Sequence, residues 1–316
     1  MFGENNSILT NAGNITGTAD NAVGMAAKGS NATNNATITL NGANSKGMFG
    51  EANGTTKSNV VNNGTIKGVN GSTVGMAVDG SKATNNSGKS IVLEGKGSTG
   101  IFGKAGSTVS NAGTIETKIV APATQPTSSK EGLVGIALNA STGTNETSGE
   151  IKLGTAYSTG MFGAATSTVI NEGKITGNQL KNVGMAGNAS TVTNKNIITL
   201  QGKSSTGIFG ENNSTLLNDT TGKITVKEEA SVGIFSKSNS NKAENKGTIL
   251  TEKKKSAGMF GSKGELENTN TITTAEEESA GMYVEHSNAT NKKTILIKGK
   301  ASAGIYAKLS DATGGI

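Results

Sequence analysis

The sequence contains no cysteine, tryptophan or arginine, and only two prolines and one histidine in 316 residues. Without cysteine, the chain has no disulfide, no thiolate metal site and no cysteine nucleophile. All 29 basic residues are lysines, which lack the planar fork with which arginine contacts phosphate and guanine. We therefore expect no nucleic-acid partner despite the net charge of +6. The apolar runs are also much shorter than the ~20 residues of a membrane helix, so we expect no membrane insertion of this segment.

Residue types that carry catalysis are scarce as well. His286 has no partner at the spacing of a metal site or a catalytic triad, and the aspartates lie far apart in the chain. A polysaccharide lyase or hydrolase needs clustered carboxylates and a base. The sequence has no calcium-binding repeat and no phosphate-loop motif. We therefore expect no enzyme activity, no metal and no cofactor.

A short motif repeats along the whole chain, with a period of about 25 residues. Its anchor is a glycine followed by Met or Ile, and downstream of each glycine come an asparagine and then an isoleucine. The anchors are Gly24, Gly47, Gly75, Gly100, Gly135, Gly160, Gly184, Gly207, Gly233, Gly258, Gly281 and Gly304. All eight methionines fall in the slot after the anchor, and the next slot holds an aromatic residue or, in alternating repeats, alanine. A period in this range is typical of a stacked repeat architecture.

The repeat predicts an all-β fold. From Thr99 one unit reads TGIFG, STVSN and GTIET, which are three short strand-like runs separated by turn residues. One unit cannot bury its own apolar residues, but units stacked at the strand spacing of ~4.8 Å can. We predict a three-strand-per-coil parallel β-helix (a β-solenoid) of about 12–13 coils, roughly 60 Å long. Residues 1–316 form a single solenoid that we expect to be uncapped at both ends.

One arc of the repeat is longer than the others. The distance from the isoleucine to the next anchor is nine residues in every repeat except that from Ile115 to Gly135, where it is 20. Both prolines, Pro122 and Pro126, fall there, and proline cannot donate to a strand ladder. We predict an inserted loop at residues 117–131. It is either a recognition element, with Pro122 and Pro126 as candidate partner-binding residues, or a tolerated excursion.

The scarce aromatic residues give a second candidate site. Neighbours in a strand point to opposite faces, so inward Met and Ile place the next slot on the outside. The column would then be a ridge for a glycan or protein partner, or its rings turn inward at a corner of the coil. The candidate partner-binding residues are Phe49, Phe102, Phe162, Phe209, Phe235, Phe260, Tyr283 and Tyr306. A charged column predicts ion pairs between coils through Lys203, Glu229, Lys254, Glu277 and Lys300.

The phrases VGMA, STGMFG, STGIFG, NNGTI, NAGTI and NKGTI resemble passenger domains of type V autotransporters, in particular the large fusobacterial autotransporter adhesins. The resemblance covers essentially the whole chain. It implies a right-handed parallel β-helix, secreted and anchored at the Gram-negative outer membrane by a C-terminal β-barrel to which further coils lead. It also implies a virulence role in cell adhesion, with a host-cell or bacterial surface protein or glycan as partner.

The sequence therefore predicts an adhesive stalk segment on the cell surface. The alternative is a purely structural spacer without a ligand of its own. An ice-binding solenoid is a further alternative, because Thr37, Thr65, Thr114 and other threonines share a column, but Lys174, Lys223 and other residues interrupt it.

Overall fold

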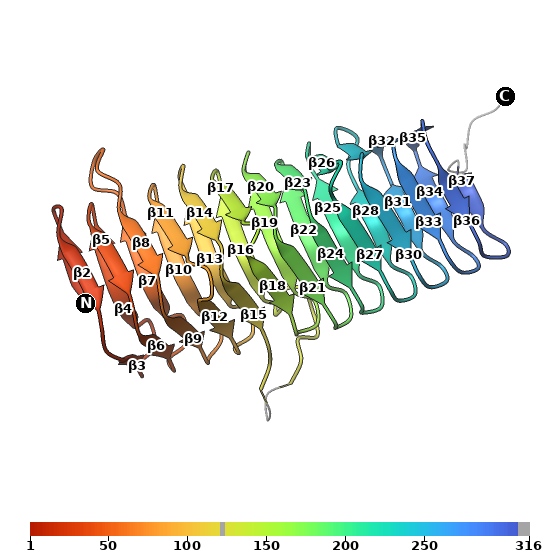
Figure 1. Ribbon diagram of the computed structural model, residues 1–316. Helices are drawn as coiled ribbons and strands as arrows, with labels where there is room; N and C mark the ends of the chain where they lie inside the picture. Colours follow the sequence, from red (N-terminus) through yellow and green to blue (C-terminus); the bar gives the residue numbers. More distant parts are fainter. Residues whose placement is uncertain (121–123, 309–316) are drawn as a thin grey trace.

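The computed structural model describes residues 1–120 and 124–308, and in these residues the chain forms a parallel β-solenoid of about 13 coils without helices. It follows that no described segment is a helix long and apolar enough to cross a membrane. The coils stack along one axis (Figure 1), and each coil adds one strand to each of three sheets. The predicted fold class is confirmed.

The largest sheet, here called sheet A, has 13 strands in parallel order. Its strands carry the anchor glycine and the aromatic column. They are β1 (Phe2–Glu4), β4 (Val23–Lys28), β7 (Lys46–Glu51), β10 (Val74–Asp79), β13 (Thr99–Lys104), β16 (Val134–Asn139), β19 (Thr159–Ala164), β22 (Val183–Asn188), β25 (Thr206–Glu211), β28 (Val232–Ser236), β31 (Ala257–Gly261), β34 (Ala280–Glu285) and β37 (Ala303–Lys308).

Sheet B has 12 strands, each of which ends on the repeated asparagine. They are β2 (Ile8–Asn11), β5 (Asn31–Asn34), β8 (Asn59–Asn62), β11 (Lys82–Asn85), β14 (Thr108–Asn111), β17 (Thr142–Asn145), β20 (Thr168–Asn171), β23 (Thr191–Asn194), β26 (Thr215–Asn218), β29 (Lys242–Asn245), β32 (Gly264–Asn268) and β35 (Ser287–Asn291).

Sheet C also has 12 strands and carries the repeated isoleucine. They are β3 (Ile15–Gly17), β6 (Thr37–Leu40), β9 (Thr65–Gly68), β12 (Ser90–Leu93), β15 (Thr114–Thr117), β18 (Glu150–Leu153), β21 (Lys174–Gly177), β24 (Ile197–Leu200), β27 (Lys223–Val226), β30 (Thr248–Thr251), β33 (Thr271–Thr274) and β36 (Ile295–Ile297).

The strands pair in register, so each repeated residue lies beside its counterpart in the next coil. Met76 pairs with Met48 and with Ile101, for example. The Met/Ile column of sheet A and the Ile column of sheet C point into the coil, where Met76 and Ile91 are fully buried. Each such side chain contributes about 1.5–3 kcal/mol by leaving water. The core is therefore a narrow stack of ladders that runs through the centre of the rod.

The anchor glycine is required by a close approach between coils. A Cβ on Gly160 would lie 2.5 Å from the carbonyl oxygen of Gly184 and 2.8 Å from Cγ2 of Ile175. The strand bends here, because Gly160 and Met161 are both buried while Thr159 and Phe162 flank them on the outer side. As a result, the residue before the glycine and the aromatic residue share the outer face of sheet A.

The asparagines form one continuous hydrogen-bonded ladder. Each side-chain Nδ2 donates to Oδ1 of the asparagine in the following coil, from Asn11 to Asn291, at 2.7–2.9 Å. From Asn34 to Asn268 these side chains are fully buried. A buried amide needs partners for both ends, and the asparagines of the two adjacent coils supply a donor on one side and an acceptor on the other.

Serine forms further ladders that the sequence analysis did not identify. The backbone N–H of Ser205 donates to Oγ of Ser231 at 3.2 Å, and Ser231 donates likewise to Ser256 at 3.3 Å. An equivalent column runs through Ser30, Ser58 and Ser81. The signal in the sequence is a serine two residues before most anchor glycines and another directly before most strands of sheet B. These hydroxyls satisfy backbone groups where the chain turns between sheets.

The predicted charged column forms an ion pair between its own members at one step only. Lys203 pairs with Glu229 at 3.5 Å. Two coils further, the pairs are Lys253–Glu276 at 2.8 Å and Lys255–Glu278 at 3.5 Å. No ion pair of the described residues joins Glu229 to Lys254, Lys254 to Glu277 or Glu277 to Lys300. Flanking residues make these contacts instead, because a run of three like charges offers three possible partners.

Replacing the anchor glycine should destabilise the rod. We expect Gly160→Ala to cost ~1–3 kcal/mol, the usual effect of overpacking, because its Cβ would meet the backbone of the next coil. The urea midpoint of unfolding measures this. Gly13→Ala is the control, since its Cβ would meet nothing within 4 Å. Equal midpoints for both variants would show that the close approach does not require glycine.

Interrupting the asparagine ladder should cost a similar amount. Asn145→Ala leaves Oδ1 of Asn171 without the donor at 2.8 Å that it has now. An unsatisfied buried polar group costs ~1–3 kcal/mol, so we expect a lower urea midpoint. The control is Asn139→Ala, because Asn139 is exposed. A midpoint as high as that of the control would contradict a stabilising role of the ladder.

Candidate ligand-binding groove

The aromatic column lies on the outer face of sheet A. Phe102, Phe162 and Phe260 are half-buried, whereas Ile101, Met161 and Met259, one residue earlier, are fully buried in the core. Phe49, Phe209, Phe235 and Tyr283 are half-buried as well, and Tyr306 in the last described strand is 48 % exposed. Of the two alternatives left open above, the outward orientation is correct, and the inward turn at a corner is wrong.

In the N-terminal two thirds of the rod, aromatic residues alternate with alanine from coil to coil. Ala77 pairs with Phe49 on one side and with Phe102 on the other. Although Ala77 is on the outer face, it is only 3 % exposed, as expected if the adjacent rings cover it. Ala186, between Phe162 and Phe209, is 7 % exposed. Around Ala77 and Ala186 the rings therefore fill the outer face of their own sheet, whereas Ala26 and Ala137 in the same column are half-buried.

From Phe209 onwards the alternation stops and every coil carries a ring. The ring centroids of Phe209, Phe235, Phe260, Tyr283 and Tyr306 follow one another at 5.4, 4.6, 5.0 and 5.1 Å. The contacts alternate between edge-to-face and stacked geometry, both of which are favourable for aromatic pairs. Five successive coils thus carry a continuous aromatic ladder.

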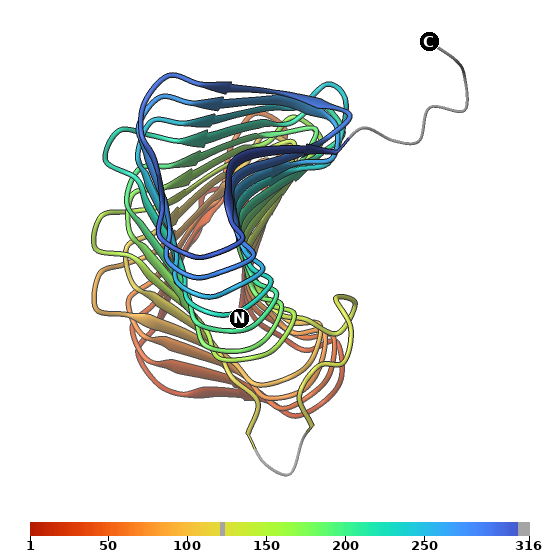
Figure 2. The ribbon, with the colours of Figure 1, turned by 90° about the vertical axis from the view of Figure 1, so that its right-hand side faces the viewer.

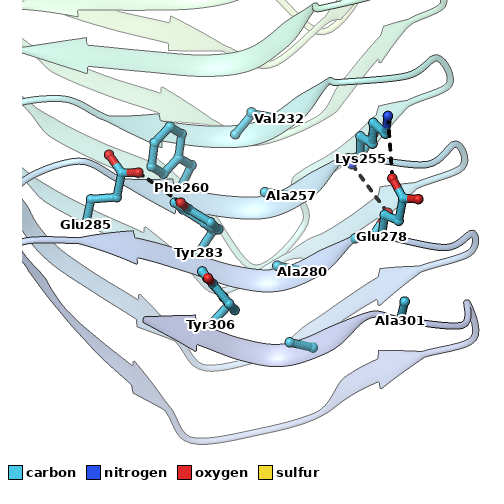
Figure 3. Close-up of a pocket in the computed structure, with 13 residues that line it drawn as sticks. Val232, Lys255, Ala257, Phe260, Glu278, Ala280, Tyr283, Glu285, Ala301 and Tyr306 are labelled. Atoms are coloured by element: carbon cyan, nitrogen blue, oxygen red, sulfur yellow. Dashed lines mark hydrogen bonds and ion pairs between the residues drawn. The ribbon is translucent and has the colours of Figure 1, made fainter. Parts of the chain in front are cut away.

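A groove of about 550 Å³ runs beside this ladder. We call it the aromatic groove and define it by three rows, which Figure 3 shows on successive coils. The rings of Phe260, Tyr283 and Tyr306 form one wall, and turn residues Lys255, Glu278 and Ala301 form the opposite rim. The floor is the column of residues that precede the anchor glycines, namely Val232, Ala257, Ala280 and Ala303.

The groove opens because small residues occupy the floor. Earlier coils carry a longer side chain in this column, as at Lys46, Val74, Thr99 and Val183. In the last three described coils the column is alanine, within the phrases SAGMF, SAGMY and SAGIY. Sequence analysis found the rings but not this floor, and the replacement of VGMA and STGMFG by these phrases was the available signal.

The charges at the groove neutralise one another. On the rim, Lys255 pairs with Glu278 at 3.5 Å. On the wall, the hydroxyl of Tyr283 donates to Oε1 of Glu285 at 2.9 Å, and Lys308 lies 3.8 Å from the same carboxylate. The hydrogen bond to Glu285 raises the pKa of Tyr283 above its ordinary value, so this phenol stays a neutral donor at physiological pH.

The insertion lies far from the groove. It projects from the stack between β15 and β16 (Figure 2), many coils before β31. Pro122 lies outside the described residues. Pro126 is buried, and Oε1 of Gln125 accepts a hydrogen bond from the backbone N–H of Ala156 at 3.1 Å. Thr117 still belongs to β15. The structure therefore does not combine the two predicted candidate sites into one.

Glu131 fixes the end of the insertion to the rod. Its Oε2 accepts hydrogen bonds from the N–H of Thr127 at 2.8 Å and from Oγ1 of Thr127 at 3.0 Å, and Lys96 Nζ lies at 3.2 Å. The N–H of Thr127 contributes most to lowering the pKa of Glu131 below its ordinary value of 4.5. The base of the insertion is thus a defined structure.

His286 and the carboxylates of the described residues form no metal-binding cluster. His286 occupies a turn between β34 and β35 with a φ of 52°. Within residues 1–120 and 124–308, no group of three or more His, Cys, Asp or Glu side chains is placed to hold a metal ion. Aromatic and alanine side chains, with polar groups at the margins, dominate the aromatic groove.

Comparison with known families agrees with this architecture. The model of the BigA third pectate lyase-like domain matches residues 77–222, 119–266 and 211–313, which together cover more than half of the chain. The chain belongs to this family. These pectate lyase-like domains are β-helix domains of bacterial surface proteins. The three matches overlap, as expected for a repeat whose coils align in more than one position. No curated protein and no solved structure gives a significant match.

Acid should release the base of the insertion in this BigA-like domain. A carboxyl with a lowered pKa stabilises the folded contact above its unfolded pKa and loses that effect as pH falls through the folded pKa. We therefore expect the contact to be intact above pH 4.5 and to loosen below it. The amide proton shift of Thr127 in NMR should titrate with a midpoint below 4.5. In Glu131→Gln this titration should vanish, and an unchanged titration would assign it to another group.

Proposed function

We propose that this BigA-like domain is an adhesive stalk segment on a bacterial surface, and that the aromatic groove is its contact surface. The observation that carries the proposal is the continuous aromatic ladder on five successive coils, which runs beside an alanine floor in the last three of them. Exposed apolar surface of this kind is uncommon on soluble proteins and marks interaction sites. The remaining coils provide length and stiffness.

The proposal has a mechanical basis. Successive coils are held together by three parallel sheets and by the asparagine ladder. The rod is therefore stiff, and it holds a binding surface near one end at a fixed distance from the other end. The family provides further support, since it groups β-helix domains of bacterial surface proteins. The finer assignment to type V autotransporters, secreted and anchored at the outer membrane, is part of this proposal.

A spacer without a ligand is the second candidate, and one observation favours it for part of the chain. Around Ala77 and Ala186, the rings on either side cover the alanine between them and fill their own face. We propose that the coils up to Ala186 act as the spacer and that recognition is confined to the coils after them. We propose no catalytic role, because stacking and shape complementarity are what the groove side chains offer.

Removal of the groove rings should abolish cell binding. We expect labelled rod to bind host or bacterial cells in flow cytometry, and the triple variant Phe260→Ala, Tyr283→Ala and Tyr306→Ala to bind at least about tenfold less, because residues at the centre of an interface dominate its affinity. The matched control removes as many rings from self-filled coils, as Phe49→Ala, Phe102→Ala and Phe162→Ala.

The control should bind as the unchanged rod does. Circular dichroism of both variants checks that the solenoid is intact. If the unchanged rod binds no cells, the spacer is the better description of the whole chain. If both triple variants lose binding equally, the contact surface is not the aromatic groove.

A further inference from the structure

We infer that the aromatic groove binds a single extended, uncharged glycan chain that lies along the axis of the rod. This deepens the proposed adhesive function and rests on it. The sugar rings would stack on Phe260, Tyr283 and Tyr306, and their hydroxyls would reach the polar residues of the wall and the rim.

The shape of the groove selects a linear polymer. Its rows repeat once per coil over the four strands β28, β31, β34 and β37, which is a length of roughly 14 Å at the strand spacing. The floor is a single column of small side chains, with Ala280 8 % exposed between Ala257 and Ala303. The groove is one residue wide and periodic along its length. A chain of similar units therefore fits it better than the irregular surface of a protein partner does.

The groove combines apolar surfaces with polar groups, and a sugar ring likewise has an apolar C–H face and polar hydroxyls. Phe260 and the alanines offer apolar surface to the C–H face of a pyranose. Tyr283 combines a ring with a phenol at its edge, and its hydroxyl is held by Glu285 at 2.9 Å. Binding sites for small molecules are typically apolar with a few placed polar groups, and tyrosine supplies both at low conformational cost.

The charge balance selects an uncharged chain. Lys255 is engaged with Glu278, and Lys308 lies beside Glu285. These two lysines and two glutamates sum to zero, so the groove gives an acidic polysaccharide no net attraction. An acidic chain would also approach Glu278 and Glu285, and like charges placed together are unfavourable.

Peptide partners fit the groove less well. An added β-strand needs an open sheet edge, whereas the groove lies on the face of sheet A, whose strands pair with both neighbours at β31 and β34. An amphipathic helix needs a broad apolar groove for several anchor residues. Here the apolar floor is one side chain wide and the rim is charged.

Affinity electrophoresis tests this inference. The rod is run in native gels that contain a neutral β-glucan, a neutral galactomannan or polygalacturonate. We expect at least one neutral polymer to retard the rod and polygalacturonate to leave it unaffected. Calorimetry with neutral oligosaccharides of that polymer should then show affinity that rises with chain length until the groove is filled.

Two variants keep the fold and change the groove. Ala257→Val with Ala280→Val places in the floor the residue found at Val74, Val134 and Val183 of the same column, and should reduce neutral-glycan affinity at least tenfold. Thr99→Val with Thr159→Val is the matched control outside the groove and should bind normally. Tyr283→Phe keeps the ring and should retain most of the affinity.

Other results would overturn the inference. Retardation by polygalacturonate alone would mean that charge governs binding, and absence of retardation by both neutral polymers would exclude an extended neutral chain. Affinity that is independent of chain length would exclude alignment along the axis. If the floor variant loses cell binding while no neutral glycan binds, the adhesive function stands and the ligand is of another class, including a second rod, which light scattering detects.

Discussion

The constraint on which the structure depends is that every residue has its own counterpart as a neighbour, one coil above and one coil below. The asparagine ladder makes the strictest demand, because a fully buried amide such as Asn145 must both donate and accept at 2.8 Å. The anchor glycines from Gly24 to Gly281 make a steric demand of the same kind, since each passes close to the carbonyl of the next. Stability in such arrays is mainly a nearest-neighbour property, so a residue is suitable only if it suits the adjacent coils.

Inward and outward columns are therefore under different constraints. Met161, Ile175 and Asn171 have partners on both sides and admit few substitutions. On the outer face of sheet A, Thr159, Val183 and Ala257 occupy the same column with no loss of register. The residues of the outer columns can thus vary and form a binding surface while the core columns stay the same. The aromatic groove has this character, because it arises from three alanines and from rings in successive coils.

Much of the fold could be predicted from the sequence, because the repeat is visible wherever packing forces one residue type, as at Gly160, Asn171 and Ile175. The orientation of Phe162 could not be settled, since it depends on the bend at Gly160, which interrupts strand alternation. The floor at Ala257 and Ala280 was missed because alanine is an inconspicuous residue whose effect appears only beside the ring column. The serine ladders were missed for a similar reason, as serine is common in turns and Ser231 differs only in having a partner one coil away.

The asparagine ladder has a direction. Every Nδ2 donates toward the C-terminal neighbour, and the N–H groups of Ser205 and Ser231 point the same way. The side-chain dipoles therefore add head to tail, and hydrogen bonds in such chains polarise one another. In the asparagine column the two faces of a coil are consequently unlike, one presenting an Oδ1 acceptor and the other an Nδ2 donor. A finished coil is a template that accepts its successor in one orientation and one register. The rod is therefore suited to vectorial assembly, in which the coils fold in order along the chain, each on the one before it.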